Sequence, residues 1–215
     1  MQTTDQKERV LQIIELLEKD YPDAKTALDY TNPIEILVAT ILSAQCTDKR
    51  VNIVTKTLFK KYRTLQDYAD AGLAELEQDI KSTGFYRNKA KNIKNATRML
   101  LDNYDGKVPD TMEEIIKLPG VARKTGNIVL SNAYGVIVGI AVDTHVRRLA
   151  KRLGLTQNTD PDKIEADLME LVPQSYWKQV TNLLIQHGRN VCVARKPRCN
   201  SCSLNKICPS AFKET

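Results

Sequence analysis

The sequence is poor in the features that mark secreted, membrane-spanning or sheet-based proteins. No apolar run approaches the roughly eighteen residues of a membrane span, and no membrane partner is expected. The N-terminal stretch MQTTDQKERVLQ lacks the apolar core of a signal peptide. The only β-branched run, residues 136–142, is short. We therefore predict an all-α protein of the cytoplasm.

Histidine and cysteine are both scarce, and their placement is informative. His145 and His187 are the only histidines, and neither has another histidine to support a zinc site, so we expect each on a helix face or beside a ligand residue and not as a ligand. Five cysteines without a secretory signal favour a reducing compartment over disulfides. Cys46 stands alone in an apolar segment, where we expect a buried small side chain. The remaining four cysteines lie together near the C-terminus.

These four cysteines have the spacing C-x6-C-x2-C-x5-C and are Cys192, Cys199, Cys202 and Cys208. Four thiolates so close in sequence can converge on one inorganic centre. A structural zinc site usually pairs two short C-x2-4-C knuckles across a longer gap, whereas here one C-x2-C pair is flanked by two single cysteines. The spacing suits a [4Fe–4S] cluster, and zinc and disulfides remain as alternatives.

The charge is moderately basic and concentrated at the C-terminus. The 215 residues include 32 basic and 26 acidic side chains, for a formal net charge of +6. A polyanionic partner is consistent with this balance. Arg195, Lys196 and Arg198 lie between the first two clustered cysteines. They can compensate the charge of a thiolate-bound centre or contact phosphates, and composition favours neither role over the other.

Apolar residues recur with helical spacing through most of the chain, which predicts about ten helices. The clearest segments are residues 10–17, 34–42, 51–59, 93–100 and 164–172. Expected N-terminal signals are the capping boxes Asp5 with Glu8 and Thr111 with Glu114, and the cap-proline pairs Asn32-Pro33 and Asp160-Pro161. Gly154 and Gly188 are expected to follow helix ends.

A tight turn between two helices is predicted at Pro119-Gly120. The basic pair Arg123-Lys124 follows at the start of the second helix. The free amides and the dipole at that helix start form a site suited to a phosphate. An ordinary αα-turn would explain Pro-Gly but not the basic pair, so both interpretations stay open.

Asp143 opens another predicted helix and has two possible roles. Asp is common as an N-cap, and capping is the more frequent role at a helix start. The apolar residues 140–142 precede it, however, so its carboxylate is expected near buried surface. A partly desolvated carboxylate near a cation is also typical of catalytic sites.

Together these segments resemble the endonuclease III family of helix-hairpin-helix DNA glycosylases over almost the whole chain. The resemblance is carried by LSAQCTD, GFYRNKA, LPGVARKTGN, VDTHVRRL, HGR and the C-terminal cysteines. It implies that Cys192, Cys199, Cys202 and Cys208 bind a [4Fe–4S] cluster. It also implies an all-α fold with a six-helix domain at residues 25–135, carrying the helix-hairpin-helix motif. A second domain, residues 1–24 and 136–215, would carry the cluster loop.

The resemblance assigns roles residue by residue. Lys124 matches the nucleophile, with a pKa expected to be lowered by partial burial and the helix start, and Asp143 matches its carboxylate partner across a cleft. Gln45 matches the residue that fills the gap left by the extruded nucleotide, and Phe85 stands at the apolar wedge, where the family commonly has an aliphatic side chain. Gly120 and Ala122 belong to the hairpin, where Ala122 replaces a usual glycine. Gly126 replaces a usual alanine.

The function implied is that of a bifunctional glycosylase and AP lyase. Such an enzyme removes oxidised pyrimidines from double-stranded DNA and nicks 3′ to the abasic site by β-elimination, acting as a monomer at the nucleoid. The cluster loop would present Arg195, Lys196 and Arg198 to the DNA backbone. A monofunctional mismatch glycosylase and a non-enzymatic iron–sulfur DNA-binding protein are the alternatives, and the lysine at position 124 argues against the first.

Overall fold

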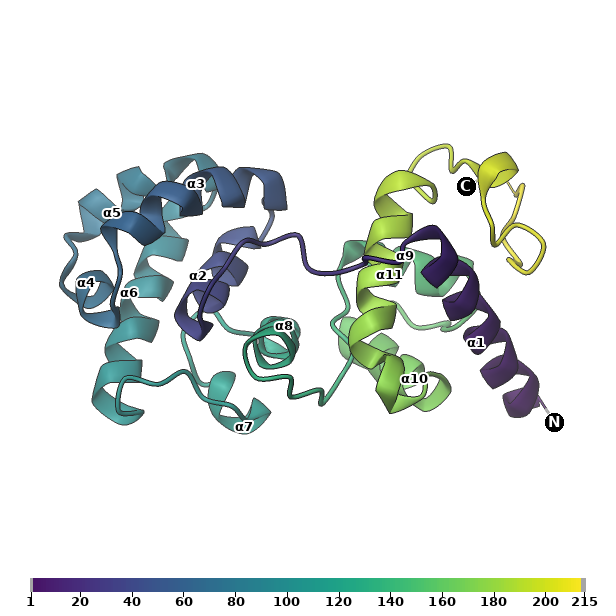
Figure 1. The fold of residues 1–215 in the computed structure, drawn as a ribbon, viewed down its shortest axis with the longest axis horizontal. Helices are drawn as coiled ribbons and strands as arrows, with labels where there is room; N and C mark the ends of the chain where they lie inside the picture. The colour runs from purple at the N-terminus through teal and green to yellow at the C-terminus, as the bar shows by residue number, and fades with distance from the viewer. Residues whose placement is uncertain (1, 214–215) are drawn as a thin grey trace. The chain divides into compact units, whose positions relative to one another are not determined.

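The computed structural model describes residues 2–213, and all regular structure among them is helical. Eleven α-helices and three 3-10 turns occur in this range, with no strand, so the all-α expectation is confirmed. The chain forms two compact units (Figure 1): unit 1 comprises Met1–Thr26 and Gly139–Thr215, and unit 2 comprises Ala27–Val138. Among the described helices, none has the length and apolar character needed to cross a membrane.

Unit 2 is built around a helix that is buried on all sides. The helices are α2 (Pro33–Ser43), α3 (Asp48–Lys61), α4 (Leu65–Asp70), α5 (Leu73–Asp79), α6 (Tyr86–Asn103), α7 (Met112–Ile115) and α8 (Arg123–Ala133), with the 3-10 turn η1 (Lys81–Thr83) before α6. Every residue of α2 from Ile36 to Leu42 is buried. A helix that is apolar all round belongs in a core, and α2 packs against α3, α6 and α8.

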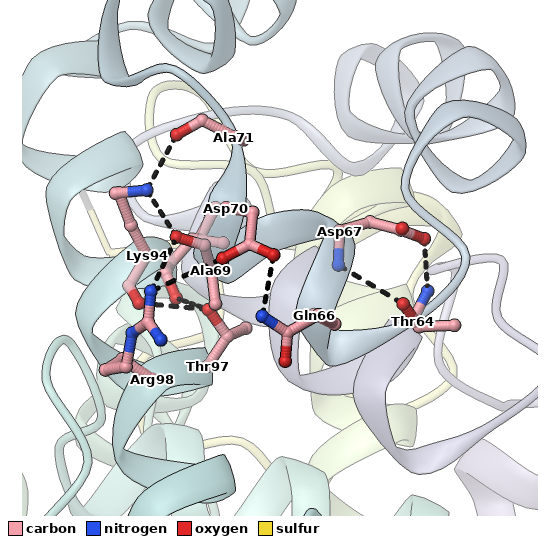
Figure 2. Close-up of polar contacts among 10 residues, drawn as sticks. Thr64, Gln66, Asp67, Ala69, Asp70, Ala71, Lys94, Thr97 and Arg98 are labelled. Atoms are coloured by element: carbon pink, nitrogen blue, oxygen red, sulfur yellow. Dashed lines mark hydrogen bonds and ion pairs between the residues drawn. The ribbon is translucent and has the colours of Figure 1, made fainter.

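Two cations of α6 hold the C-terminal end of α4 (Figure 2). Lys94 Nζ donates to the carbonyls of Ala69 and, at 2.7 Å, Ala71. Arg98 donates to the same Ala69 carbonyl at 3.3 Å. The last carbonyls of a helix lack intrahelical partners, so these donors stabilise α4 and fix α6 against it. At the other end of α4, Thr64 forms a capping box that the sequence analysis did not predict.

Unit 1 joins the N-terminal helix to the C-terminal third of the chain. It contains α1 (Gln2–Asp20), α9 (Thr144–Arg152), α10 (Pro161–Leu171), η2 (Gln174–Tyr176), α11 (Trp177–Asn190) and η3 (Cys199–Ser201). Helix α11 packs against both α1 and α9, and α10 packs against the same two helices. The core includes Ile13, Leu17, Leu149, Ile164 and Leu183. The loop after α11 carries the four clustered cysteines.

Several predicted helix boundaries are confirmed. Asn32 caps α2 by accepting from one backbone amide of the first turn, and Asp160 caps α10 by accepting from two, each with proline at the first helical position. Gly154 follows α9 with a φ of +64°, as expected for a glycine just past a helix end.

Two other expected boundaries and one capping box are wrong. Helix α1 begins at Gln2, so Asp5 lies inside it and is not its cap. Thr111 is the N-cap of α7, as expected, but it makes no side-chain capping bond, and the Glu114 carboxylate accepts from Tyr104 and Lys117. Gly188 lies within α11, where a Cβ would come within 2.9 Å of His145 Nδ1. Gly188 therefore allows close packing against α9 and does not end a helix.

Candidate functional site

Gln45 and Phe85 both project from unit 2 on strained backbone. Gln45 lies in the turn after α2 with a φ of +52°, and Phe85 precedes α6 with a φ of +47°. This left-handed region is disfavoured for residues with a Cβ. Both side chains are exposed, and Phe85 is 64% exposed despite being aromatic. Strained exposed residues of this kind typically occur at binding sites.

The predicted Pro119-Gly120 turn connects α7 to α8. Gly120 has a φ of +81°, and an added Cβ would lie 2.8 Å from the side chain of Asn92. Both the backbone conformation and the lack of space therefore require glycine. Ala122 is the N-cap of α8 and makes no side-chain capping bond. Its φ of −92° is allowed for any residue, so alanine fits here without strain. The first amides of α8 thus follow a tight, exposed turn, as a phosphate site requires.

Lys124 stands in the first turn of α8, directly after this turn. Its side chain is exposed, so the expectation of partial burial is wrong. The reason is the face that α8 buries, which is formed by Gly126, Asn127, Val129 and Leu130 further along the helix. The amine of Lys124 is therefore accessible to a large substrate in the free protein.

Gly126 replaces the expected alanine for a visible packing reason. Helix α7 lies so close that a Cβ on Gly126 would be 2.8 Å from Met112 Sδ and 3.1 Å from Ile115 Cγ2. Glycine in a helix interior costs about 1 kcal/mol relative to alanine. The larger side chains of α7 fill the space that a methyl group would otherwise take.

Asp143 is half-buried at the start of α9, after the buried residues Ala141 and Val142. It is the N-cap, as the structural interpretation predicts. Its Oδ1 accepts from the amides of His145 and Val146, each at 2.8 Å. Both bonds end on Oδ1, so the cap does not use Oδ2. A capping role therefore does not prevent the carboxylate from acting on a substrate.

His145, on the first turn of α9, packs tightly against α11. Its Nδ1 lies 3.2 Å from an Arg148 nitrogen, and Arg148 also donates to the Gly188 carbonyl at 2.8 Å. Desolvation lowers the pKa of His145, and Arg148 and Arg189 lower it further, although Asp143 opposes them. The ring is thus kept neutral beside Asp143, and it contributes no positive charge to that side of the site at neutral pH.

The four clustered cysteines are all half-buried in the loop that follows α11. Burial raises the pKa of Cys202 and of Cys208, and Cys192 and Cys199 raise both further, while backbone amides lower them. Such a thiol-only set fits a metal–sulfur group, whose positive metal ions would favour the thiolate form. Among the described residues, no three His, Cys, Asp or Glu side chains are grouped to hold a single metal ion.

Arg152 of α9 and His187 of α11 hold this loop in place, and of the two only Arg152 was not considered in the sequence analysis. Arg152 donates to Cys192 Sγ at 3.3 Å and to the Val193 carbonyl at 2.8 Å. His187 is buried, with Nε2 3.3 Å from Cys202 Sγ and Nδ1 3.2 Å from the hydroxyl of Tyr21. Arg152 lies about one helical turn after Arg148, and this spacing is the sequence signal from which its contact with Cys192 could have been predicted.

Arg195, Lys196 and Arg198 are exposed on the segment between Cys192 and Cys199. Lys196 adopts a φ of +54°, and the Arg198 amide bonds back to the Val191 carbonyl at 3.0 Å. The segment thus folds back to the end of α11 and leaves its three cations exposed. Cys46 also differs from expectation, since it is half-buried at the edge of the unit 2 core.

Comparison with known proteins gives consistent matches over nearly the full length. The family model described as HhH-GPD superfamily base excision DNA repair protein matches residues 38–174. A relative from Synechocystis sp. named endonuclease III is 54% identical over 205 residues, covering 95% of this chain and 94% of the relative. Two solved structures, a non-covalent endonuclease III–DNA complex and a trapped endonuclease III–DNA covalent intermediate, are each 47% identical with a TM-score of 0.92. Each match covers 95% of this chain and 96% of the other.

Proposed function

This chain belongs to the endonuclease III family of HhH-GPD base excision DNA repair proteins, and we propose that it acts through Lys124 as a bifunctional DNA glycosylase and AP lyase. The observation that carries the proposal is an accessible amine on the first turn of α8, directly after the Gly120 turn. The similar endonuclease III solved as a trapped covalent intermediate with DNA supports it.

The substrate in this proposal is double-stranded DNA that contains an oxidised pyrimidine or an abasic site. The enzyme works as a monomer on nucleoid DNA in the cytoplasm. A base inside a duplex cannot reach a protein side chain, so it must be extruded at a cost of a few kcal/mol. Phe85 and Gln45, both exposed on strained backbone, enter the vacated stack and offset part of that cost.

The chemistry follows from the use of an amine as nucleophile. Lys124 Nζ, after losing a proton, attacks C1′ of the extruded nucleotide, and the base leaves with the electron pair of the glycosidic bond. The nitrogen–carbon bond becomes an imine to the opened sugar. Loss of a proton from C2′ then expels the 3′ phosphate by cleavage of the C3′–O bond, and water releases the enzyme. Attack by water would give base removal alone.

Asp143 stabilises the positive charge that develops on the sugar. Carboxylates have this role at other glycosidic bonds. Its free oxygen, Oδ2, is available because the cap uses only Oδ1. Lys124 and Asp143 belong to different units of the chain, and their joint action on one nucleotide is part of the proposal.

We further propose that Cys192, Cys199, Cys202 and Cys208 bind a [4Fe–4S] cluster. Their shared loop, their half-burial and the number of thiols support a four-thiolate site. The cluster supplies structural order to the loop and takes no part in bond cleavage. The loop in turn presents Arg195, Lys196 and Arg198 to the DNA backbone.

Borohydride trapping tests the role of Lys124 directly. Reduction of the imine should attach the wild-type protein covalently to a duplex that carries an oxidised pyrimidine. Lys124→Ala should abolish both trapping and nicking while leaving lesion binding largely intact. Lys124→Arg is the matched control, because it keeps the positive charge but offers no amine that forms an imine at C1′.

The outcomes separate this function from its alternatives. Base release without trapping by the wild-type protein would indicate a monofunctional glycosylase. Lesion binding without base release would indicate a non-enzymatic DNA-binding protein in which Asp143 is only a cap. A trapped adduct that persists in Lys124→Ala would show that another amine is the nucleophile.

A further inference from the structure

Lys89 connects the two segments of unit 2 that end in Gln45 and Phe85. It lies on the first turn of α6 and is only 4% exposed. Its Nζ donates to the carbonyl of Leu42 at 2.8 Å and to the carbonyl of Thr83 at 2.8 Å. One ammonium group therefore bridges two backbone segments that are far apart in the sequence.

The two acceptors stand just before the two exposed residues. Leu42 is in the last turn of α2, shortly before Gln45, and Thr83 ends η1, shortly before Phe85. Carbonyls at helix ends lack intrahelical partners and carry partial negative charge. An ammonium with three donors can bond two such carbonyls at once and so fix the spacing between their chains.

The burial of Lys89 indicates a specific role for this bridge. Desolvation lowers the pKa of Lys89, and nearby Cys46 opposes the shift. Buried lysines are rare unless they are paired, and the hydrogen-bond partners here are neutral carbonyls. The left-handed backbone at Gln45 and Phe85 persists only where the surrounding structure holds it. Lys89 supplies such support, because its two hydrogen bonds reach both segments.

We propose that Lys89 is a positioning residue that sets Gln45 and Phe85 at a fixed spacing, so that the two enter the DNA duplex together. The inference rests on the proposed function, since it assigns Gln45 and Phe85 to the vacated stack. It predicts that Lys89 affects entry into the duplex and leaves the imine chemistry of Lys124 unchanged.

Lys89→Met tests the inference, because methionine keeps the unbranched stem and removes all three donors. Lys94→Met is the matched control. Lys94 lies on the same helix and also bonds two carbonyls, but these belong to the end of α4 (Figure 2). Both variants therefore remove a carbonyl-capping ammonium from α6, and only Lys89→Met removes the bridge between the two segments.

Two substrates distinguish entry into the duplex from chemistry. On a duplex with an oxidised pyrimidine, Lys89→Met should lose about tenfold in base release, as expected for residues coupled through one network, whereas Lys94→Met should stay within about twofold. On a single-stranded oligonucleotide with an abasic site, borohydride trapping should stay within about twofold of wild type for both. If the wild-type protein traps neither this oligonucleotide nor a duplex with an abasic site, the proposed function itself is wrong.

A double-mutant cycle gives the second readout. If Lys89 acts through Gln45 and Phe85, then adding Lys89→Met to a variant with both Gln45→Ala and Phe85→Ala should cause no further loss of duplex activity. The inference is overturned if Lys89→Met and Lys94→Met lose the same duplex activity or if the losses in the cycle are additive. It is also overturned if Lys89→Met loses as much on the single strand as on the duplex. If Lys89→Met does not fold, Lys89→Gln, which keeps a shorter donor, is measured against the same control and the same limits.

Discussion

At the residue scale, Asp143 shows how one carboxylate can carry two roles. Its Oδ1 takes both amide bonds of the α9 cap, so the cap leaves Oδ2 unused. Sequence alone could not separate the two roles, because an aspartate at a helix start has the same pattern in both. The positions of the capping bonds make the roles separable by experiment.

Asp143→Asn should retain the fold but lose activity. Asparagine is as good an N-cap as aspartate, so the melting temperature should change little. Loss of the negative charge should lower base release by about 100-fold or more. Asp160→Asn is the control, because Asp160 makes the same pair of capping bonds at α10. If Asp143→Asn releases the base at a near wild-type rate, Asp143 acts only as a helix cap.

At the element scale, the turn before α8 depends on one glycine. Gly120→Ala places a Cβ at a φ of +81° and within 2.8 Å of the Asn92 side chain. Gly135→Ala is a matched control, since its φ is +67° but nothing lies within 4 Å of the added Cβ. We expect a loss of about 1 kcal/mol for the control and roughly 2–3 kcal/mol for Gly120→Ala, measured by denaturant unfolding. Equal losses would mean that Asn92 moves aside freely.

The C-terminal loop is the second element whose integrity depends on a few side chains. The purified protein should be brown and contain about four irons with labile sulfide. Cys202→Ser should lose the iron and loosen the loop, because metal binding and folding are coupled there. Cys46→Ser should keep the iron, since Cys46 lies outside this loop. Stoichiometric zinc without iron in anaerobically prepared protein would contradict the proposed cluster.

Helical periodicity predicted the elements better than it predicted their ends. The helical segments and the caps at Asn32 and Asp160 follow from local signals that tertiary structure does not alter. Gly188 was misassigned because close packing against His145 selects glycine as strongly as a helix end does. The bridge formed by Lys89 was invisible because its acceptors are backbone carbonyls, which leave no trace in the sequence. The exposure of Lys124 could not be predicted from the sequence, because it depends on which face of α8 packs into the core.

At the scale of the whole molecule, net charge and local charge lead to different expectations. A formal charge of +6 attracts any polyanion at long range. Direct binding to phosphates releases counterions, so that the logarithm of affinity falls linearly with the logarithm of salt concentration. Arg195, Lys196 and Arg198 are exposed on one tight segment, and this geometry favours direct binding. Their contribution can therefore be separated from net charge by the salt slope.

Neutralising these three cations together with glutamine should weaken binding to any duplex, damaged or not. The salt slope should become less steep by about one for each phosphate that the variant no longer binds, so by up to about three. The control neutralises Lys7, Lys56 and Lys60, which are exposed on α1 and α3 and change the net charge equally. If both triple variants shift affinity alike with unchanged slopes, only net charge matters. If only the loop variant loses iron, its cations instead compensate the charge of the cluster.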